Sequence, residues 1–168
     1  MRHDLVVADR LSDESSPEVP RIPASAGALI FDAAGRLLIL KPSYKKGWTV
    51  PGGQIEPSGE SPWEACRRET REECALEIER GRLVCVDFLR PKPNRAGGVR
   101  FLFDCGPFTD EQLRAIRLQA TEIEEHRLVD LSEASALLSG PLRRRVSASV
   151  ASKRCVYLED GRSVPGVS

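Results

Sequence analysis

The chain has 168 residues, and its 25 Lys and Arg residues balance its 25 Asp and Glu residues. This length predicts a single domain with a substantial core, and the neutral balance excludes a global attraction to nucleic acid or to an anionic membrane. Five cysteines, an odd number without a close pair, argue against a disulfide framework and a zinc site. We find no signal peptide and no apolar stretch that could span a bilayer, so we expect a soluble cytoplasmic protein.

The N-terminal part of the sequence begins with a polar segment and continues as a hairpin. Residues 1–20 are predicted to form a flexible arm, in which residues 5–7 could still pair at a sheet edge, and residues 21–168 a single domain. The apolar run at 24–31 predicts a strand, and a turn then returns the chain into a second strand at 37–41.

A glycine turn leads into the helix around which the chain is organised. Ser61 and Glu64 have the spacing of a reciprocal capping box, and Pro62 takes the first helical position, where a missing N–H costs nothing. After this start, residues that can be buried recur at intervals of three and four, which predicts an inner helix face. That face consists of Trp63, Cys66, Thr70 and Cys74.

Three glutamates lie together on another side of this helix. Glu69, Glu72 and Glu73 have the spacing i, i+3, i+4, so their carboxylates are neighbours and repel each other by roughly 0.2–0.5 kcal/mol per pair. A divalent cation such as magnesium, which prefers oxygen ligands, would turn this repulsion into attraction. The alternative is a solvated face with arginine neighbours. The helix by itself favours that alternative, because an exposed face tolerates so small a repulsion.

The second half of the chain predicts strands interrupted by short helices. Leu142, Val146 and Val150 form an apolar stripe that we assign to the core. This order of elements, with several hairpins, indicates an α/β sandwich around a mixed sheet. The predicted elements are strands at 83–89, 99–105, 122–129 and 155–158, and helices at 109–112, 132–138 and 141–153.

The spacing of residues around the glutamates is more specific than the glutamates themselves. In this stretch the chain resembles the Nudix hydrolases, whose conserved box it matches in order at Gly53, Glu60, Arg68, Glu69, Glu72, Glu73 and Leu76. It departs from that pattern at three places. Six residues rather than five separate Gly53 from Glu60, Thr70 replaces an aliphatic residue, and Ala75 stands where the family has a helix-ending glycine.

The resemblance implies a fold and a chemistry. The fold would be an α/β/α sandwich around a mixed β-sheet, in which the box forms a loop–helix–loop. The reaction would be hydrolysis of a nucleoside diphosphate linked to another group, by attack of water on phosphorus with Mg²⁺, or Mn²⁺ in its place, as cofactor. The implied metal ligands are the Gly53 carbonyl and the carboxylates of Glu69, Glu72 and Glu73.

The resemblance also implies further catalytic residues. Glu69 would act as a ligand or as the base, Arg68 would orient a glutamate through a bidentate contact, and Glu60 would support the helix start or an outer water. A later glutamate often completes such sites in the family. Glu122, which falls nearest the loop, is the first choice and Glu125 the second, and for both the alternative is a charged sheet edge.

Substrate contacts are harder to assign, because the family reads its substrate with loops outside the box. Trp48 and Tyr44 could stack on a base, although Trp48, next to the box, is better explained as core. Pro91 lies where ADP-ribose-cleaving members resemble this chain, which is a weak cue in a proline-rich loop. Basic residues that could meet phosphates, or equally lie on solvated loops, are Lys41, Lys45, Lys46, Arg90, Lys92, Arg95 and Arg100.

Two functions follow from the sequence. The first is a magnesium-dependent pyrophosphohydrolase that acts on a small-molecule nucleoside diphosphate derivative, such as a nucleotide, a sugar nucleotide or ADP-ribose. The alternative is a non-catalytic module of the same fold that binds a nucleotide as a sensor or partner domain. The longer turn and Ala75, which depart from the family pattern, suggest this alternative. We prefer the enzyme because every glutamate that the chemistry needs is present. We expect no nucleic acid or membrane partner and leave a homodimer open.

Overall fold

The computed structural model describes residues 21–167, which form eight strands and four helices. The predicted arm at 1–20, with its candidate strand at 5–7, lies outside the described residues. The strands are β1 (Ala24–Phe31), β2 (Leu37–Pro42), β3 (Gly52–Gln54), β4 (Arg82–Leu89), β5 (Gly98–Pro107), β6 (Ile123–Val129), β7 (Val156–Glu159) and β8 (Arg162–Ser163). The helices are α1 (Pro62–Cys74), α2 (Asp110–Arg114), α3 (Leu131–Leu137) and α4 (Gly140–Ala151).

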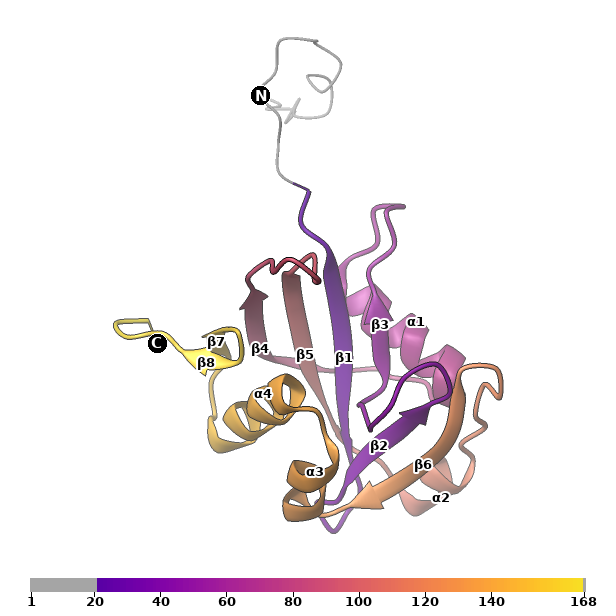
Figure 1. Cartoon of the computed structure of the whole chain (residues 1–168). Coiled ribbons are helices and arrows are strands. Elements are labelled where there is room, and N and C mark those ends of the chain that lie inside the picture. The colour runs from indigo at the N-terminus through magenta and orange to yellow at the C-terminus, as the bar shows by residue number, and fades with distance from the viewer. Residues whose placement is uncertain (1–20, 168) are drawn as a thin grey trace, which may run out of the picture.

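The strands belong to one mixed sheet (Figure 1). Its order is β6-β2-β1-β5-β4-β7-β8, and β3 pairs with β1 beside this path. Strand β1 runs parallel to β5 and antiparallel to β2 and β3, whereas β4 runs antiparallel to β5 and parallel to β7. The predicted mixed sheet is therefore confirmed, and β1 is an inner strand that pairs with β2, β3 and β5.

Helices cover both faces of the sheet. On one face α1 and α2 pack through buried residues such as Cys66 and Leu113, and on the other α3 and α4 pack through residues such as Val146. Successive residues of β1 point to opposite faces of the sheet. Ile30 packs in the core under α1 and α2, and Leu29 packs in the core under α3 and α4. The predicted α/β/α sandwich is confirmed. No helix within residues 21–167 is long and apolar enough to cross a membrane.

Helix α1 begins as predicted and ends without a glycine. The Ser61 hydroxyl accepts from the Glu64 N–H (3.2 Å), the Glu64 carboxylate accepts from the Ser61 N–H (2.8 Å), and Pro62 opens the first turn. After Cys74, Ala75 adopts the left-handed conformation, with φ of 55°, that glycine adopts without strain. The predicted inner face is confirmed, with Trp63 partly buried and Cys66, Thr70 and Cys74 fully buried.

One prediction for the C-terminal part is corrected, and one strand there is not predicted. The stripe predicted for α4 includes Val150, but this side chain is 43% exposed. Residues along a helix are about 100° apart, so Ser149 lies closer than Val150 to the face of Leu142 and Val146. Ser149 is the residue buried there, and its hydroxyl donates to the Arg145 carbonyl at 2.8 Å. Strand β8 is not predicted, because two residues are too few to carry an alternating pattern.

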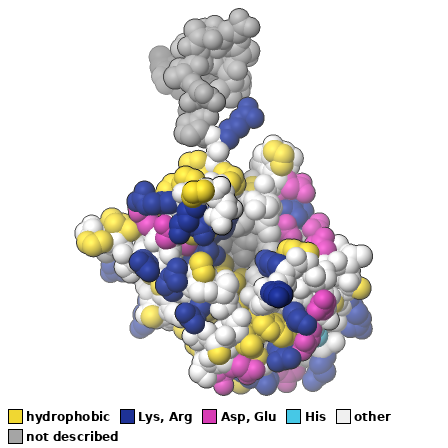
Figure 2. Space-filling model, in the orientation of Figure 1, with side chains coloured by type: hydrophobic (Ala, Val, Ile, Leu, Met, Phe, Trp, Pro, Cys, Tyr) yellow, Lys and Arg dark blue, Asp and Glu magenta, His cyan; other side chains and the backbone are white. Residues whose placement is uncertain are grey.

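The surface of the molecule is hollowed where β1, β3 and α4 come together (Figure 2). In this view Lys and Arg side chains lie on both sides of the hollow, and Asp and Glu side chains gather mainly to its right. A hollow surrounded by charges of both signs suits a polar ligand, and we therefore describe it residue by residue below.

We expect Ala75→Gly to stabilise the protein by roughly 0.5–1 kcal/mol, because glycine relieves the left-handed backbone while making the unfolded chain more flexible. The matched control is Ala115→Gly at the end of α2, where φ is −79° and glycine should instead destabilise. Denaturant unfolding of both variants measures the difference. Equal losses of stability in the two variants would contradict the strain at Ala75.

Candidate active site

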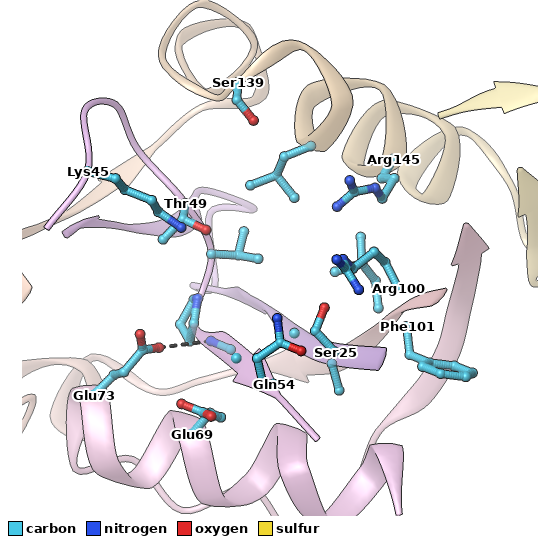
Figure 3. A pocket seen from close by; sticks show the side chains of 18 of the residues that line it. Ser25, Lys45, Thr49, Gln54, Glu69, Glu73, Arg100, Phe101, Ser139 and Arg145 are labelled. Atoms are coloured by element: carbon cyan, nitrogen blue, oxygen red, sulfur yellow. Dashed lines mark hydrogen bonds between the residues drawn. The ribbon is translucent and has the colours of Figure 1, made fainter. Parts of the chain in front are cut away.

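Two glycines of β3 let neighbouring elements approach the backbone of the strand closely, β1 at Gly52 and helix α1 at Gly53. A Cβ on Gly52 would lie 2.3 Å from the carbonyl oxygen of Ala26 on β1, so this position excludes every side chain. The Gly52 N–H donates to Glu73 Oε2 at 2.8 Å (Figure 3). A Cβ on Gly53 would lie 2.3 Å from a carboxylate oxygen of Glu69. The Glu69 carboxylate thus occupies space that a side chain on Gly53 would fill, whereas Glu73 reaches β3 through the Gly52 N–H.

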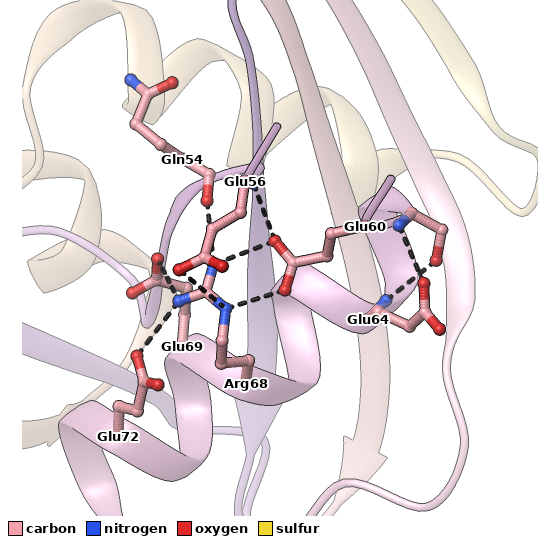
Figure 4. A network of polar contacts seen from close by, with 8 residues as sticks. Gln54, Glu56, Glu60, Glu64, Arg68, Glu69 and Glu72 are labelled. Atoms are coloured by element: carbon pink, nitrogen blue, oxygen red, sulfur yellow. Dashed lines mark hydrogen bonds and ion pairs between the residues drawn. The ribbon is translucent and has the colours of Figure 1, made fainter. Parts of the chain in front are cut away.

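Arg68 organises the outer side of the site (Figure 4). Its Nε and one terminal nitrogen donate to the two carboxylate oxygens of Glu60 at 2.7 and 3.0 Å. Its other terminal nitrogen donates to Glu69 at 2.9 Å and to Glu72 at 3.0 Å. The Glu60 carboxylate, with Glu69 and Glu72 after it, raises the pKa of Arg68 above its ordinary value. One guanidinium therefore ties the turn before α1 to the acidic residues of the helix.

The additional residue before Glu60 leaves this network intact. It is accommodated in an exposed turn at 57–59, where Gly59 has a positive φ of 91°. Beyond the turn, the Glu60 carboxylate accepts from the Glu56 N–H (2.9 Å) as well as from Arg68. The longer turn extends into solvent, and Glu60 still forms its paired hydrogen bonds with Arg68 of the helix.

Burial makes the charged forms of Glu69 and Glu73 unfavourable. Glu73 is 3% exposed, and burial raises its pKa to about 7. The Glu69 and Glu122 carboxylates raise this pKa further, whereas the hydrogen bond from the Gly52 N–H opposes the rise. Burial also raises the pKa of Glu69, although Arg68 opposes it. Neighbouring carboxylates that are both withdrawn from water favour the binding of a proton or a cation.

Glu69 and Glu73 form one wall of a cavity of about 700 Å³. Figure 3 shows Arg100 and Arg145 across the cavity from these glutamates, with Lys45 at a third side. Sites for small molecules have volumes of roughly 300–1,000 Å³, so the cavity has the size of a small-molecule site. Between the charged walls, the apolar lining is made by Ala26, Val50, Phe101, Leu102 and Leu142.

Of the glutamates at positions 122, 124 and 125, Glu122 alone lines the cavity. It lies in the exposed turn before β6, and the Gln119 N–H of the same segment donates to the Glu73 carbonyl at 3.2 Å. Glu124 and Glu125 instead form ion pairs with basic neighbours on the sheet, at 2.9 and 2.7 Å. The first choice for the completing glutamate is thus brought to the site, and the second is not.

Glu72 does not line the cavity. Its side chain is 47% exposed and contacts Arg68 on the outer side of α1. The predicted site residues that the structure brings together at one wall are Gly53, Glu69, Glu73 and Glu122.

Few of the candidate substrate contacts reach the cavity. Tyr44 lies at its rim and is 65% exposed, with the Lys45 ammonium 5.3 Å from the centre of its ring. Trp48 packs against the core under α3 and α4, and the Arg127 guanidinium lies 4.7 Å from its ring centre. Among the basic candidates, Lys45 and Arg100 line the cavity, whereas Lys41, Lys46, Arg90, Lys92 and Arg95 do not.

Sequence reasoning missed Arg145 of α4, which lines the cavity. It follows Leu142 by three residues and so lies beside the apolar stripe of α4. A charged side chain next to a buried stripe was the sequence signal that could have identified it. Its Nε donates at 2.6 Å to Asp87 of β4, which is fully buried. The motif search around α1 could not reach either residue, because the sheet brings them together from distant parts of the chain.

The residues at the acidic wall fit a hard divalent cation. Glu69 and Glu73 offer carboxylate oxygens, the Gly53 carbonyl would add another oxygen, and a cation would offset the cost of two adjacent desolvated carboxylates. Within residues 21–167, no three Asp, Glu, His or Cys side chains converge closely enough to hold an ion by themselves. Water and substrate phosphates would have to supply the other positions, which is typical of magnesium.

Comparisons with known proteins point to one family. The model of the NUDIX domain matches residues 21–150. No curated protein matches the chain significantly. Among solved structures, the MutT protein from Methanosarcina mazei Go1 is 26% identical with a TM-score of 0.61, covering 78% of this chain and 92% of that one. A C. elegans Ap4A hydrolase binary complex is 27% identical with a TM-score of 0.57, covering 77% and 98%.

A more distant structure shares the fold alone. The NUDIX domain of Shewanella oneidensis NrtR, solved with ADP ribose, is 14% identical with a TM-score of 0.65. The alignment covers 79% of this chain and 89% of that chain, so the likeness extends over the whole sandwich.

We expect Arg68→Ala to destabilise the protein by about 2–3 kcal/mol, because three carboxylates lose their shared cation and repel one another. The control is Arg82→Ala, whose pair with Asp104 is largely exposed and should contribute less than about 1 kcal/mol. Chemical denaturation without divalent cations provides the measurement. A loss at Arg68 no larger than that at Arg82 would mean that the network in Figure 4 does not support the fold.

Proposed function

The chain belongs to the Nudix hydrolase family, and on this basis we propose that it is a magnesium-dependent pyrophosphohydrolase. It would cleave the diphosphate of a nucleoside diphosphate linked to another group. The observation that carries this proposal is the pair of carboxylates, Glu69 and Glu73, at the wall of a cavity of small-molecule size. The similarity to an Ap4A hydrolase supports a small nucleotide derivative as the substrate.

The acidic wall would hold the cation. Glu69, Glu73 and the Gly53 carbonyl are the proposed ligands, and Mn²⁺ would be accepted by the same oxygen donors. Glu72, which Arg68 holds outside the cavity, would have to leave that contact to join them. Glu122 would approach from the turn before β6 and bind either the cation or a water between them.

The chemistry is an attack of water on phosphorus, with cleavage of one phosphorus–oxygen bond of the diphosphate. Bound magnesium would neutralise charge on the phosphoryl oxygens and lower the pKa of the attacking water. Glu69 would accept the proton that the water releases through the carboxylate oxygen that does not bind the cation. Arg68 would keep the Glu69 carboxylate aimed into the cavity through its 2.9 Å contact.

Turnover of a substrate panel tests the proposal. The panel contains dNTPs, ADP-ribose, NADH, nucleotide sugars and dinucleoside polyphosphates, each with Mg²⁺, with Mn²⁺ and with EDTA, and the released phosphate products are detected. We expect cleavage of at least one member, dependent on the cation. Binding of a panel member without cleavage of any would instead favour the non-catalytic sensor. The longer turn and Ala75 are the features that suggest a sensor, but both leave the carboxylates of α1 in place.

Glu73→Gln should slow hydrolysis by at least about a hundredfold, because a charge near the reacting phosphate is removed. The amide still accepts from the Gly52 N–H, so the metal-free protein should become more stable, by roughly 0.5–2 kcal/mol. Steady-state kinetics and thermal unfolding in EDTA measure the two effects. The exposed Glu79→Gln is the control, and wild-type turnover in Glu73→Gln would exclude Glu73 from the site.

Gly53→Ala should fold normally yet lose turnover by roughly tenfold to a hundredfold. Its Cβ would meet the end of the flexible Glu69 side chain, so the carboxylate moves while the backbone stays. The control is Gly140→Ala, where a Cβ meets nothing closer than 3.5 Å. Unchanged kinetics in Gly53→Ala, with an unchanged melting temperature, would show that the position of the Glu69 carboxylate does not matter.

A further inference from the structure

Two arginines line the cavity wall that faces away from the glutamates. Figure 3 shows Arg100 from β5 and Arg145 from α4 with their guanidinium groups directed into the cavity, apart from Glu69 and Glu73. The proposed reaction uses neither arginine.

Among the described residues, Arg145 keeps most of its hydrogen-bond donors free of protein partners. Its side chain is 12% exposed, and its Nε donates at 2.6 Å to Asp87, which is 0% exposed. The other oxygen of Asp87 accepts from the Gly161 N–H at 2.9 Å. Within residues 21–167 this is the ion pair that Arg145 forms, and it engages one edge of the guanidinium. The terminal nitrogens, which carry four of its five N–H groups, are left for the cavity.

Arg100 has no carboxylate partner in the part of the chain that the structure describes. Its terminal nitrogens donate, at 3.2–3.5 Å, to the backbone carbonyls of Pro23, Gly97 and Val99. These carbonyls are neutral and do not balance the charge. Burial, followed by the nearby Arg145 guanidinium, lowers the pKa of Arg100.

A fold gains little from this arrangement. Buried ion pairs contribute weakly to stability compared with apolar residues of the same size, and two neighbouring cations repel each other. An anion between the two guanidiniums would remove that repulsion, and planar arginine forks are suited to bind phosphate through paired N–H groups.

We propose that Arg100 and Arg145 form an anion subsite that binds a phosphate group of the substrate other than the diphosphate that is cleaved. The inference rests on the proposed function for placing the cleaved diphosphate at Glu69 and Glu73. It narrows the substrate to nucleoside diphosphate derivatives with at least one additional phosphate. That phosphate is either a monoester on a sugar or an extension of the phosphate chain.

Matched ligand pairs that differ in the additional phosphate provide the test. NADPH and NADH differ by a phosphate monoester on the sugar, and the dinucleoside tetraphosphate Ap4A differs from Ap2A by the length of its chain. Dissociation constants are measured by calorimetry in EDTA, so the result does not depend on turnover. We expect the phosphate-rich member of one pair to bind the wild-type protein at least tenfold more tightly, and the pair that responds identifies the source of the phosphate.

Arg100→Gln should weaken the preferred ligand by about tenfold to a hundredfold and its partner less than about threefold. Arg145→Lys keeps a cation beside Asp87 and should likewise reduce the preference, with thermal unfolding as the check that it folds. The exposed Arg154→Gln, outside the cavity, is the control and should leave both affinities unchanged. No preference in either pair, or an equal loss for both members in Arg100→Gln, would overturn the subsite.

The two proposals can fail separately. Cation-dependent cleavage of the panel without any preference for additional phosphate would leave the hydrolase and remove the subsite. A preference in EDTA that depends on Arg100, without cleavage of any ligand when Mg²⁺ is added, would leave the subsite and remove the pyrophosphohydrolase.

Discussion

The close approach of helix α1 to the backbone of β3 is the constraint on which the rest of the site depends. It brings the Glu73 carboxylate to the Gly52 N–H and leaves the Glu69 carboxylate in the space where Gly53 would otherwise carry a side chain. Carboxylate oxygens therefore gather beside β3, which pairs with the inner strand β1. Without this contact the glutamates would be an ordinary acidic face of an exposed helix.

The start of α1 and most of the strands could be predicted from sequence because their signals are local. The capping pair Ser61 and Glu64 and the short repeats of buried residues each lie within a few positions of one another. Most of the acidic wall could also be named, because Gly53, Glu69 and Glu73 follow one another within a single turn and helix, and the family resemblance added Glu122. The basic wall could not. Arg145 and Asp87 are far apart in the chain, and nothing near either residue indicates that β4 and α4 will meet.

Both walls of the cavity carry charge that the fold alone would not select. Burial raises the pKa of Glu73 at one wall, and Arg100 lies without a carboxylate partner among the described residues at the other. Each wall is relieved by an ion of the opposite sign: a cation beside the glutamates and an anion beside the arginines. The phosphate-rich nucleotide and the magnesium that we propose would supply both ions, and the cavity would then be most favourable when filled.

The two walls are also built by separate parts of the chain. The acidic wall is assembled from β3 and α1, whereas Arg145 is held through Asp87 by the turn at Gly161 near the C-terminus. If the proposed subsite is correct, changes in the final helix and hairpin would alter which compound is recognised without disturbing the acidic wall. Such a division would let related chains evolve new ligand specificities while they keep the residues for hydrolysis.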